Sequence, residues 1–442
     1  MFARYKRFFF VFTVLSLTVL SLTSIALAAN VLRVCHTFTQ PERVEFMEKV
    51  AKDFEKEYDA KVELEIVPWD KVRDKWVTAA AARSLPDVMV GTPNDAMAIW
   101  IAGSSTHLND VYEELGGEKF FMSDIVNKLC NYKGDLIALP LYAHTRLLIY
   151  RADIFKEVGV KAPETWDELL EVTKKVNNPP TRYGAMQFWG LGDRGATIYL
   201  YSLLRANESS YLDENFNAKF DTPEFIETVK MLVDWYNVGS PPGELGLKFH
   251  EQWFTSFVSG INTMGIDTMF IASTVKAENP ELYDKGAVGA CRIPVNEGKK
   301  LGYYCDTPSL ILTNGSNPEL AKEFIKYMYE PARYVDFLLT MPGGQFPVIY
   351  PASDSEVLWS HPIIKENEEG VKATLDGIAA GGTLPGMTYG VNPYAPLIEE
   401  SNVIERMMHS IVGENVPIEE AVLQAQADLQ KNIDDLRSRI GE

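Results

Sequence analysis

The sequence predicts an α/β protein of two domains. Strand-like runs alternate with amphipathic helices from about residue 31 onward, a rhythm typical of a mostly parallel sheet covered by helices. The chain has 442 residues. About 410 of them follow an apolar leader, and that length is too great for one ordinary hydrophobic core.

The first strands and helices follow in regular order. Residues 31–34 form an apolar strand, and a helix with one apolar stripe begins at Pro41. Residues 62–66 alternate between apolar and polar, and residues 87–90 have the composition of a buried strand. These segments predict successive βαβ units.

The same alternation continues after an apolar run at 136–140. Thr165 and Glu168 have the side chains of a reciprocal helix N-cap, and the last helix, from about 417 to 440, carries one apolar face. Residues 377–394 are rich in Gly and Pro, which predicts a long ordered loop.

Residues 1–29 have the features of a secretory signal peptide. Basic residues within 4–7 precede an apolar run at 8–20, and small residues at 26–28 mark a cleavage site. A membrane anchor is the alternative, but the run is interrupted by Thr and Ser and is short for a span of about 20 residues. We expect a soluble mature protein in the periplasm or another extracytoplasmic space.

The composition excludes several classes of function. Removing the leader takes three of the 42 Lys and Arg and none of the 61 Asp and Glu, so the net charge changes from −19 to −22. Nucleic-acid binding needs a clustered basic surface, which the sequence lacks. The four cysteines and six histidines have no metal-ligand spacing. We therefore expect a monomer with no nucleic-acid partner, no metal and no cofactor.

The cysteines suit an oxidising compartment but are too few for a disulfide framework. Cys291 and Cys305 flank an expected hairpin with its turn near 296–298, which predicts a disulfide between them. Cys35 and Cys130 each adjoin an apolar strand-like run, where a second disulfide or two buried thiols would fit.

Four stretches, spread in order over most of the mature chain, resemble the extracellular solute-binding proteins of family 1, the maltose-binding-protein-like receptors of ABC importers. They are residues 132–140 (YKGDLIALP), 147–155 (LLIYRADIF), 162–169 (APETWDEL) and 317–324 (NPELAKEF). Each stretch alone is a weak signal, and the four together are a strong one.

This resemblance implies a two-domain periplasmic-binding-protein-like fold of type II, with a ligand cleft between the domains. Three chain crossings at a hinge are expected near 141–147, 290–293 and 345–348. Each lobe is then discontinuous: residues 30–142 plus 294–346, and residues 143–293 plus 347–442. The implied function is capture of a sugar or polyol in a cleft that closes on it, for delivery to a membrane ABC permease complex.

The first expected crossing carries three site candidates. Tyr142, His144 and Arg146 alternate, so an extended backbone places their side chains on one face. Aromatic rings stack on the apolar face of a sugar, and polar groups bind its hydroxyls. A ligand contact or a structural bridge between the domains fits Tyr142 and Arg146 equally well. The family's contact at this crossing matches His144 best.

Loops after the first strands carry further candidates. Asn94 and Asp95 match ligand contacts of the family, although a helix cap explains either residue alone equally well. Gln40 matches another contact loop. Trp69 follows the second strand and suits stacking or burial under the next helix.

In the second domain Trp189 is the first choice of stacking platform. Asp267 and Phe270 occupy the family's strand-loop-helix segment that presents an aromatic residue. Asp306 replaces a glycine-rich turn of the family and adds a carboxylate beside Asp267. Trp253 fits an ordinary amphipathic helix.

Three other functions remain open. A secreted glycoside hydrolase would also use paired carboxylates, here Asp267 and Asp306. However, no nucleophile elbow, zinc motif or phosphate loop is present, so we expect no catalysis. A binding protein for a phosphorylated polyol would need more cations than Arg146. One for a cationic osmolyte would need an aromatic cage, which Trp189, Trp69 and Tyr142 could supply.

Overall fold

The computed structural model describes residues 30–69, 71–300 and 302–442. The expected signal peptide, residues 1–29, lies outside the described residues. Within the described ranges, no helix combines the length and the apolar character needed to cross a lipid bilayer.

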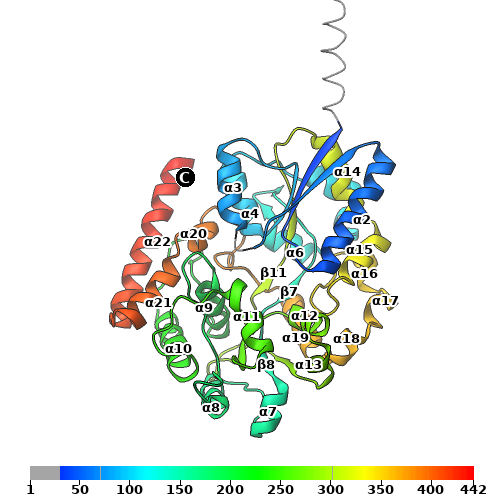
Figure 1. The fold of residues 1–442 in the computed structure, drawn as a ribbon. Helices are drawn as coiled ribbons and strands as arrows, with labels where there is room; N and C mark the ends of the chain where they lie inside the picture. Colours follow the sequence, from blue (N-terminus) through cyan, green and yellow to red (C-terminus); the bar gives the residue numbers. More distant parts are fainter. Residues whose placement is uncertain (1–29, 70, 301) are drawn as a thin grey trace, which may run out of the picture.

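A five-stranded sheet forms the upper half of the molecule in Figure 1. β1 pairs in parallel with β2 and β3, whereas β12 runs antiparallel to both β3 and β6. Four of the five strands thus run in one direction and β12 alone opposes them, so the prediction of a mostly parallel sheet is confirmed for this half. The strands lie in the order β2 (Lys61–Ile66), β1 (Val31–His36), β3 (Val88–Gly91), β12 (Ser309–Leu312) and β6 (Leu139–Pro140).

A three-stranded sheet lies in the lower half, where β8 (Leu147–Arg151) runs between β9 (Met264–Asp267) and β10 (Val288–Cys291). Both pairs are antiparallel. The expectation that parallel βαβ units continue along the chain is wrong here, because β9 and β10 both return beside β8 in the opposite direction.

Two short strands lie between the halves (Figure 1). β7 (His144–Thr145) follows β6 along the chain, and it pairs with β11 (Cys305–Asp306), which leads into β12. Ala143 also forms a bridge with Phe346. Three segments that are distant in sequence thus meet between the two sheets, and the two-domain α/β architecture is confirmed.

Helices cover both sheets. Thr165 and Glu168 form the predicted capping box at the start of α8, and α22 buries the predicted apolar face along one flank of the molecule. Residues 380–394 form the expected loop between α19 and α20. The helices are α2 (Pro41–Tyr58), α3 (Val72–Ala81), α4 (Pro93–Ile101), α5 (Asn109–Leu115), α6 (Ser123–Leu129), α7 (Ala152–Val158), α8 (Trp166–Val176), α9 (Gly195–Ala206), α10 (Pro223–Gly239), α11 (Phe249–Val258), α12 (Phe270–Glu278), α13 (Pro280–Asp284), α14 (Pro318–Met328), α15 (Pro331–Leu338), α16 (Tyr350–Ser353), α17 (Glu356–Trp359), α18 (Pro362–Glu366), α19 (Glu368–Ala379), α20 (Ala395–Glu400), α21 (Val403–Gly413) and α22 (Ile418–Ile440).

The predicted disulfide between Cys291 and Cys305 is wrong. Cys291 ends β10, which pairs with β8, whereas Cys305 lies in β11, which pairs with β7. The two strands do not form a hairpin with each other, so their cysteines are not cross-strand neighbours. All four cysteines are free thiols, and Cys35 and Cys130 are the two buried thiols of the sequence alternatives.

Titration of thiols checks this correction. Burial raises the pKa of Cys35 to about 11 and the pKa values of Cys130, Cys291 and Cys305 to about 12, so the folded protein should react slowly with a thiol reagent near pH 8. After unfolding without reductant, four thiols per chain should react. A count of two would mean that a disulfide forms.

His36, at the end of β1, is buried as a neutral imidazole. Its Nδ1 accepts a hydrogen bond from the Phe38 N–H at 3.3 Å, and its ring stacks on that of Phe38. Burial and the nearby charge of Arg43 lower the pKa of His36 from 6.5 to about 4.

Acidification should therefore destabilise the fold through His36. Because the folded pKa lies below the unfolded value, the stabilisation is complete above pH 6.5 and is lost as the pH falls toward 4. This difference corresponds to roughly 3 kcal/mol. Urea unfolding between about pH 7 and pH 4.5 should show a weaker pH dependence in His36→Gln. The control His107→Gln, at an exposed position, should keep the original dependence, and identical curves for the two variants would contradict the assignment.

Candidate functional site

The segment between β6 and β8 brings three predicted residues to one place. Tyr142, His144 and Arg146 are all buried. The rings of Tyr142 and His144 lie 5.6 Å apart, and the Arg146 N–H donates to the Tyr304 carbonyl at 2.9 Å. His144 is the register partner of Asp306 across the β7–β11 pair. Pairing with β11 thus fixes the direction of these side chains.

Two carboxylates meet the guanidinium of Arg146. Its Nη1 donates to Asp267 Oδ1 at 3.0 Å, and its Nη2 lies 4.0 Å from Asp306 Oδ2. Asp306 Oδ2 also lies 3.8 Å from His144 Nε2. We call His144, Arg146, Asp267 and Asp306 the central cluster. It contains four of the predicted site residues.

The pKa values of the two carboxyl groups shift in opposite directions. Burial raises the pKa of Asp267, and the charge of Arg146 only partly offsets this effect. Burial acts on Asp306 in the same direction, but His144, Arg146 and Arg194 outweigh it and lower the pKa of Asp306. Burial lowers the pKa of His144, so the imidazole is neutral near pH 7.

Aromatic rings border the central cluster. The Phe270 ring lies 5.6 Å from that of His144 and 5.9 Å from that of Tyr142. Trp253 donates its indole N–H to Asp267 Oδ2 at 2.6 Å. Trp253 is thus more than the ordinary helix residue expected from the sequence, because it orients a carboxylate. The Tyr304 ring lies 5.5 Å from the Arg146 guanidinium.

A second group of charges combines α3 and α4 of the upper half with the loop before α9 and with α20. Arg73 and Arg194 both pair with the buried carboxylate of Glu399, the latter at 3.3 Å, and Arg73 lies 3.9 Å from Asp95. Burial alone would raise the pKa of Glu399, but the two guanidiniums lower it. We call Arg73, Asp95, Arg194 and Glu399 the rim network.

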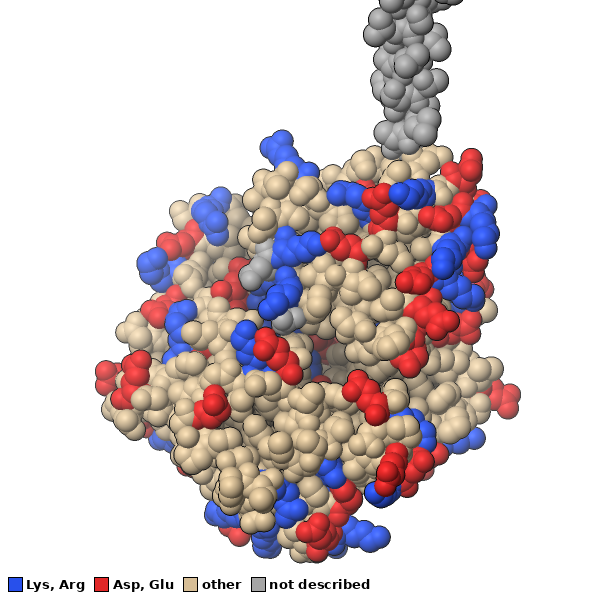
Figure 2. All heavy atoms as spheres, viewed as in Figure 1, with Lys and Arg blue, Asp and Glu red and all other residues tan. Residues whose placement is uncertain are grey.

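The rim network lines a polar cavity of about 100 Å³, together with Trp69, Asp193 and His250. Trp69 lies 5.7 Å from the Arg194 guanidinium, in cation–π contact. Arg194 is near enough to Asp306 to affect its pKa, so the cavity and the central cluster are neighbours. Figure 2 shows a hollow near the centre of the molecule, with acidic and basic side chains around it. We call the polar cavity and the central cluster together the cleft.

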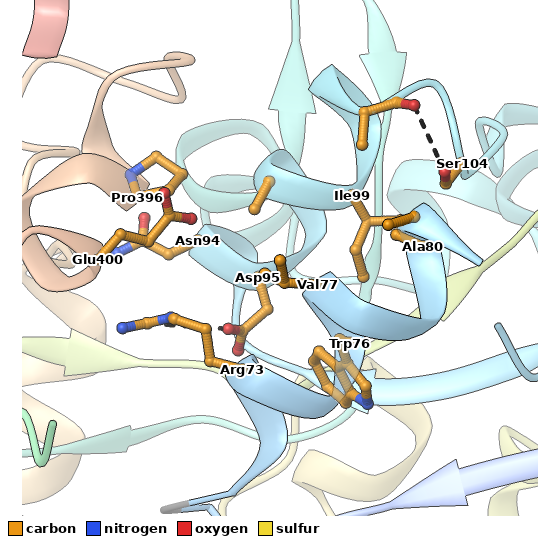
Figure 3. A pocket seen from close by; sticks show the side chains of 13 residues that line it. Arg73, Trp76, Val77, Ala80, Asn94, Asp95, Ile99, Ser104, Pro396 and Glu400 are labelled. Carbon is orange, nitrogen blue, oxygen red and sulfur yellow. Dashed lines mark hydrogen bonds and ion pairs between the residues drawn. The ribbon is translucent and has the colours of Figure 1, made fainter. Parts of the chain in front are cut away.

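An apolar groove of about 270 Å³ adjoins the cleft and shares Arg73, Asp95 and Glu400 with it. It lies between α3, α4 and α20, and Figure 3 shows Arg73 and Asp95 directed toward each other at its edge. Asn94 donates to the Pro385 carbonyl at 3.3 Å. Asp95 accepts the N–H and hydroxyl of Thr92, so the helix-cap interpretation holds for Asp95.

Several buried polar atoms near the cleft have no protein partner among the described residues. In the central cluster these atoms are both ring nitrogens of His144, Arg146 Nε and Asp306 Oδ1, and Asn94 Oδ1 is another at the groove. Because buried donors and acceptors are costly when they have no partner, these atoms are candidates for contact with a polar ligand.

Two predicted residues, Trp189 and Gln40, belong neither to the central cluster nor to the lining of the polar cavity or the apolar groove. The Trp189 ring stacks on Tyr236 of α10 at 4.7 Å and is buried there. The prediction that Trp189 is a stacking platform for the ligand is therefore wrong, and Trp189 is a core residue. Gln40 precedes α2, and its side chain accepts from Arg43 Nη1 at 3.4 Å.

The sequence analysis missed Arg73, Arg194 and Glu399. The charged pair Asp193-Arg194 between Gly192 and Gly195 was an available signal for a functional loop, but nothing local connects it to Glu399. No group of three His, Cys, Asp or Glu suited to a metal ion occurs within 30–69, 71–300 and 302–442.

Comparisons with known proteins agree with this architecture. The Escherichia coli (strain K12) protein YcjN is 23% identical over 424 residues, which cover 91% of each chain. An ABC transporter solute-binding protein from Agrobacterium radiobacter K84, solved with ribitol, superimposes with a TM-score of 0.75 at 19% identity and covers 91% of this chain and 98% of its own. One from Thermotoga lettingae TMO, solved with α-D-tagatose, gives 0.75 at 21% identity, covering 91% and 99%.

These solved structures share the two-domain type II fold predicted from the sequence. The family model for the bacterial extracellular solute-binding protein matches residues 40–333. The chain therefore belongs to the bacterial extracellular solute-binding protein family.

Proposed function

We propose that the chain captures a neutral sugar or polyol in the cleft and delivers it to a membrane ABC permease as a monomer. The observation that carries this proposal is the set of unpartnered buried atoms in the central cluster. Asp306 Oδ1 is an acceptor, Arg146 Nε is a donor, and the neutral His144 ring offers one of each. Neighbouring hydroxyls, which both donate and accept, match this set.

Charge balance favours a neutral ligand. The Arg146 guanidinium is paired with Asp267 and lies near Asp306, and Arg73 and Arg194 share Glu399. A phosphorylated polyol would have to compete with these carboxylates for each guanidinium. The aromatic cage that a cationic osmolyte needs is incomplete, because Trp189 packs against Tyr236 instead.

The geometry of Asp267 argues against a glycoside hydrolase. Its raised pKa alone would suit a general acid. However, one oxygen accepts from Arg146 and the other from Trp253. Because protein donors already engage both oxygens, neither is free to act on a substrate, which supports a binding role without catalysis.

We propose that two lobes close around the ligand, and the position of the cleft supports this proposal. We propose the lobe boundaries 30–142 plus 294–346 and 143–293 plus 347–442, joined at the β7–β11 pair. Residues 1–29 are proposed to direct export and to be removed. A ligand that contacts both lobes stabilises the closed form by its higher affinity for that form.

Ligand screening tests the proposed ligand class. Neutral sugars and polyols, with ribitol and tagatose among them, should include at least one compound that raises the melting temperature. Asp306→Asn should weaken its binding by about tenfold to a hundredfold in calorimetry, since a hydrogen bond to a charged group is lost. Lys52→Gln, an exposed change on α2, should have no effect.

Stabilisation only by phosphorylated polyols or betaines would contradict the neutral-ligand proposal. Chromatography of the same mixtures should recover every sugar unchanged, and turnover that disappears in Asp267→Asn would contradict the binding-only role.

Solution scattering tests closure. The radius of gyration should decrease on saturation with the ligand found in the screen, because both lobes contact it. At the same ligand concentration, Asp306→Asn should compact less, in proportion to its lower occupancy. A tightly bound ligand that leaves the radius of gyration unchanged would contradict closure, while the binding proposal would stand.

A further inference from the structure

A second polar cavity, of about 500 Å³, lies beside β11. It is lined from α6 by Lys128, from α9 by Arg205, and from the loop 380–390. It shares no lining residue with the cleft cavity or the apolar groove. Tyr303 lines this cavity, whereas the ring of the next residue, Tyr304, contacts Arg146 of the central cluster. Alternation along an extended chain thus separates the two sites.

The charge of this cavity is opposite to that of the chain. Lys128 and Arg205 line it, and none of its described lining residues is Asp or Glu, although acidic residues outnumber basic ones by 61 to 42 in the sequence. Neither cation has an ion pair within the described part of the chain. Arg205 Nη1 donates to the Ser209 carbonyl at 2.9 Å, and its Nε is buried without a partner.

Two glycines lie directly against these cations. A Cβ on Gly302 would lie 2.8 Å from Arg205 Nη2, and a Cβ on Gly381 would collide with Lys128 Nζ. Gly381 also has a φ of +67°, which favours glycine. The backbone can therefore approach both cations closely, and no side chain at these positions blocks access to them.

Hydroxyl groups add neutral donors. Thr383 and Thr388 line the cavity, and their hydroxyls lie 2.8 and 2.9 Å from that of Tyr201. The phenols of Tyr303 and Tyr389 belong to the same lining. A guanidinium, an ammonium and several hydroxyls are the groups that bind a phosphate oxyanion.

We propose that this cavity binds a small molecule bearing a phosphate group. A phosphate carries a charge of about −1.5 to −2 near pH 7, which matches the two cations better than a single carboxylate does. The cavity joins α6, which packs against β6 of the first sheet, to α9, which packs against β9 of the second. A bound phosphate would therefore contact both halves of the molecule.

Calorimetry with inorganic phosphate tests the site without knowledge of the cleft ligand, so its outcome is independent of the sugar proposal. At constant ionic strength, phosphate should bind saturably with one ion per chain, and acetate should bind more weakly. Lys128→Gln should reduce the affinity at least about tenfold, because a charge-assisted contact is lost. Its exposed position predicts an unchanged melting temperature without phosphate.

Lys52→Gln removes the same charge at an exposed position outside the cavity lining and should bind phosphate normally. Arg205→Lys keeps the charge but loses the planar donor edge, so it should bind with intermediate affinity. Absence of saturable binding, or equal affinity in Lys128→Gln and Lys52→Gln, would overturn the proposal. Acetate binding as tight as phosphate binding would overturn the assignment to phosphate.

Discussion

Burial of charge between the two sheets is the constraint on which the cleft depends. A carboxylate or guanidinium removed from water costs several kcal/mol unless partners replace the lost hydration. Arg146 comes from the crossing segment, Asp267 from the end of β9 and Asp306 from β11, and they come together only if β7 and β11 pair in the observed register. The position of the two halves and the pairing of charges in the cleft are therefore linked.

In the rim network, buried charges are likewise paired, and the paired residues are even further apart in sequence. Glu399 lies on α20, which packs against α4, and its carboxylate pairs with both Arg73 and Arg194. Removal of Glu399 would leave two guanidiniums close together in a partly buried place. Through Glu399 and Glu400, α20 thus contributes to the cleft as directly as the strands do, although it contains few residues that suggest a function from sequence.

Short sequence patterns correctly predicted the features that depend only on neighbouring residues. The alternation of Tyr142, His144 and Arg146 required only an extended backbone, and the capping box at Thr165 required only four residues. Pairings between distant segments were not predictable in this way. The expected Cys291–Cys305 bridge failed because each cysteine pairs with a different strand. The prediction for Trp189 was wrong by one position along the chain. Phe188 contacts Trp253 beside Asp267, whereas Trp189 packs against Tyr236.

The balance of charge inside the cleft limits how a ligand can be selected. Because Arg146, Arg73 and Arg194 already have carboxylate partners, a neutral ligand gains little from net electrostatic attraction. We propose that its affinity comes from hydrogen bonds to the unpartnered atoms of His144, Arg146 and Asp306 and from contact with Phe270. A solute that lacks one hydroxyl would leave a buried polar atom without a partner, and that penalty exceeds the modest gain from a correct contact. Selectivity in such a cleft therefore arises mainly from the rejection of incomplete ligands.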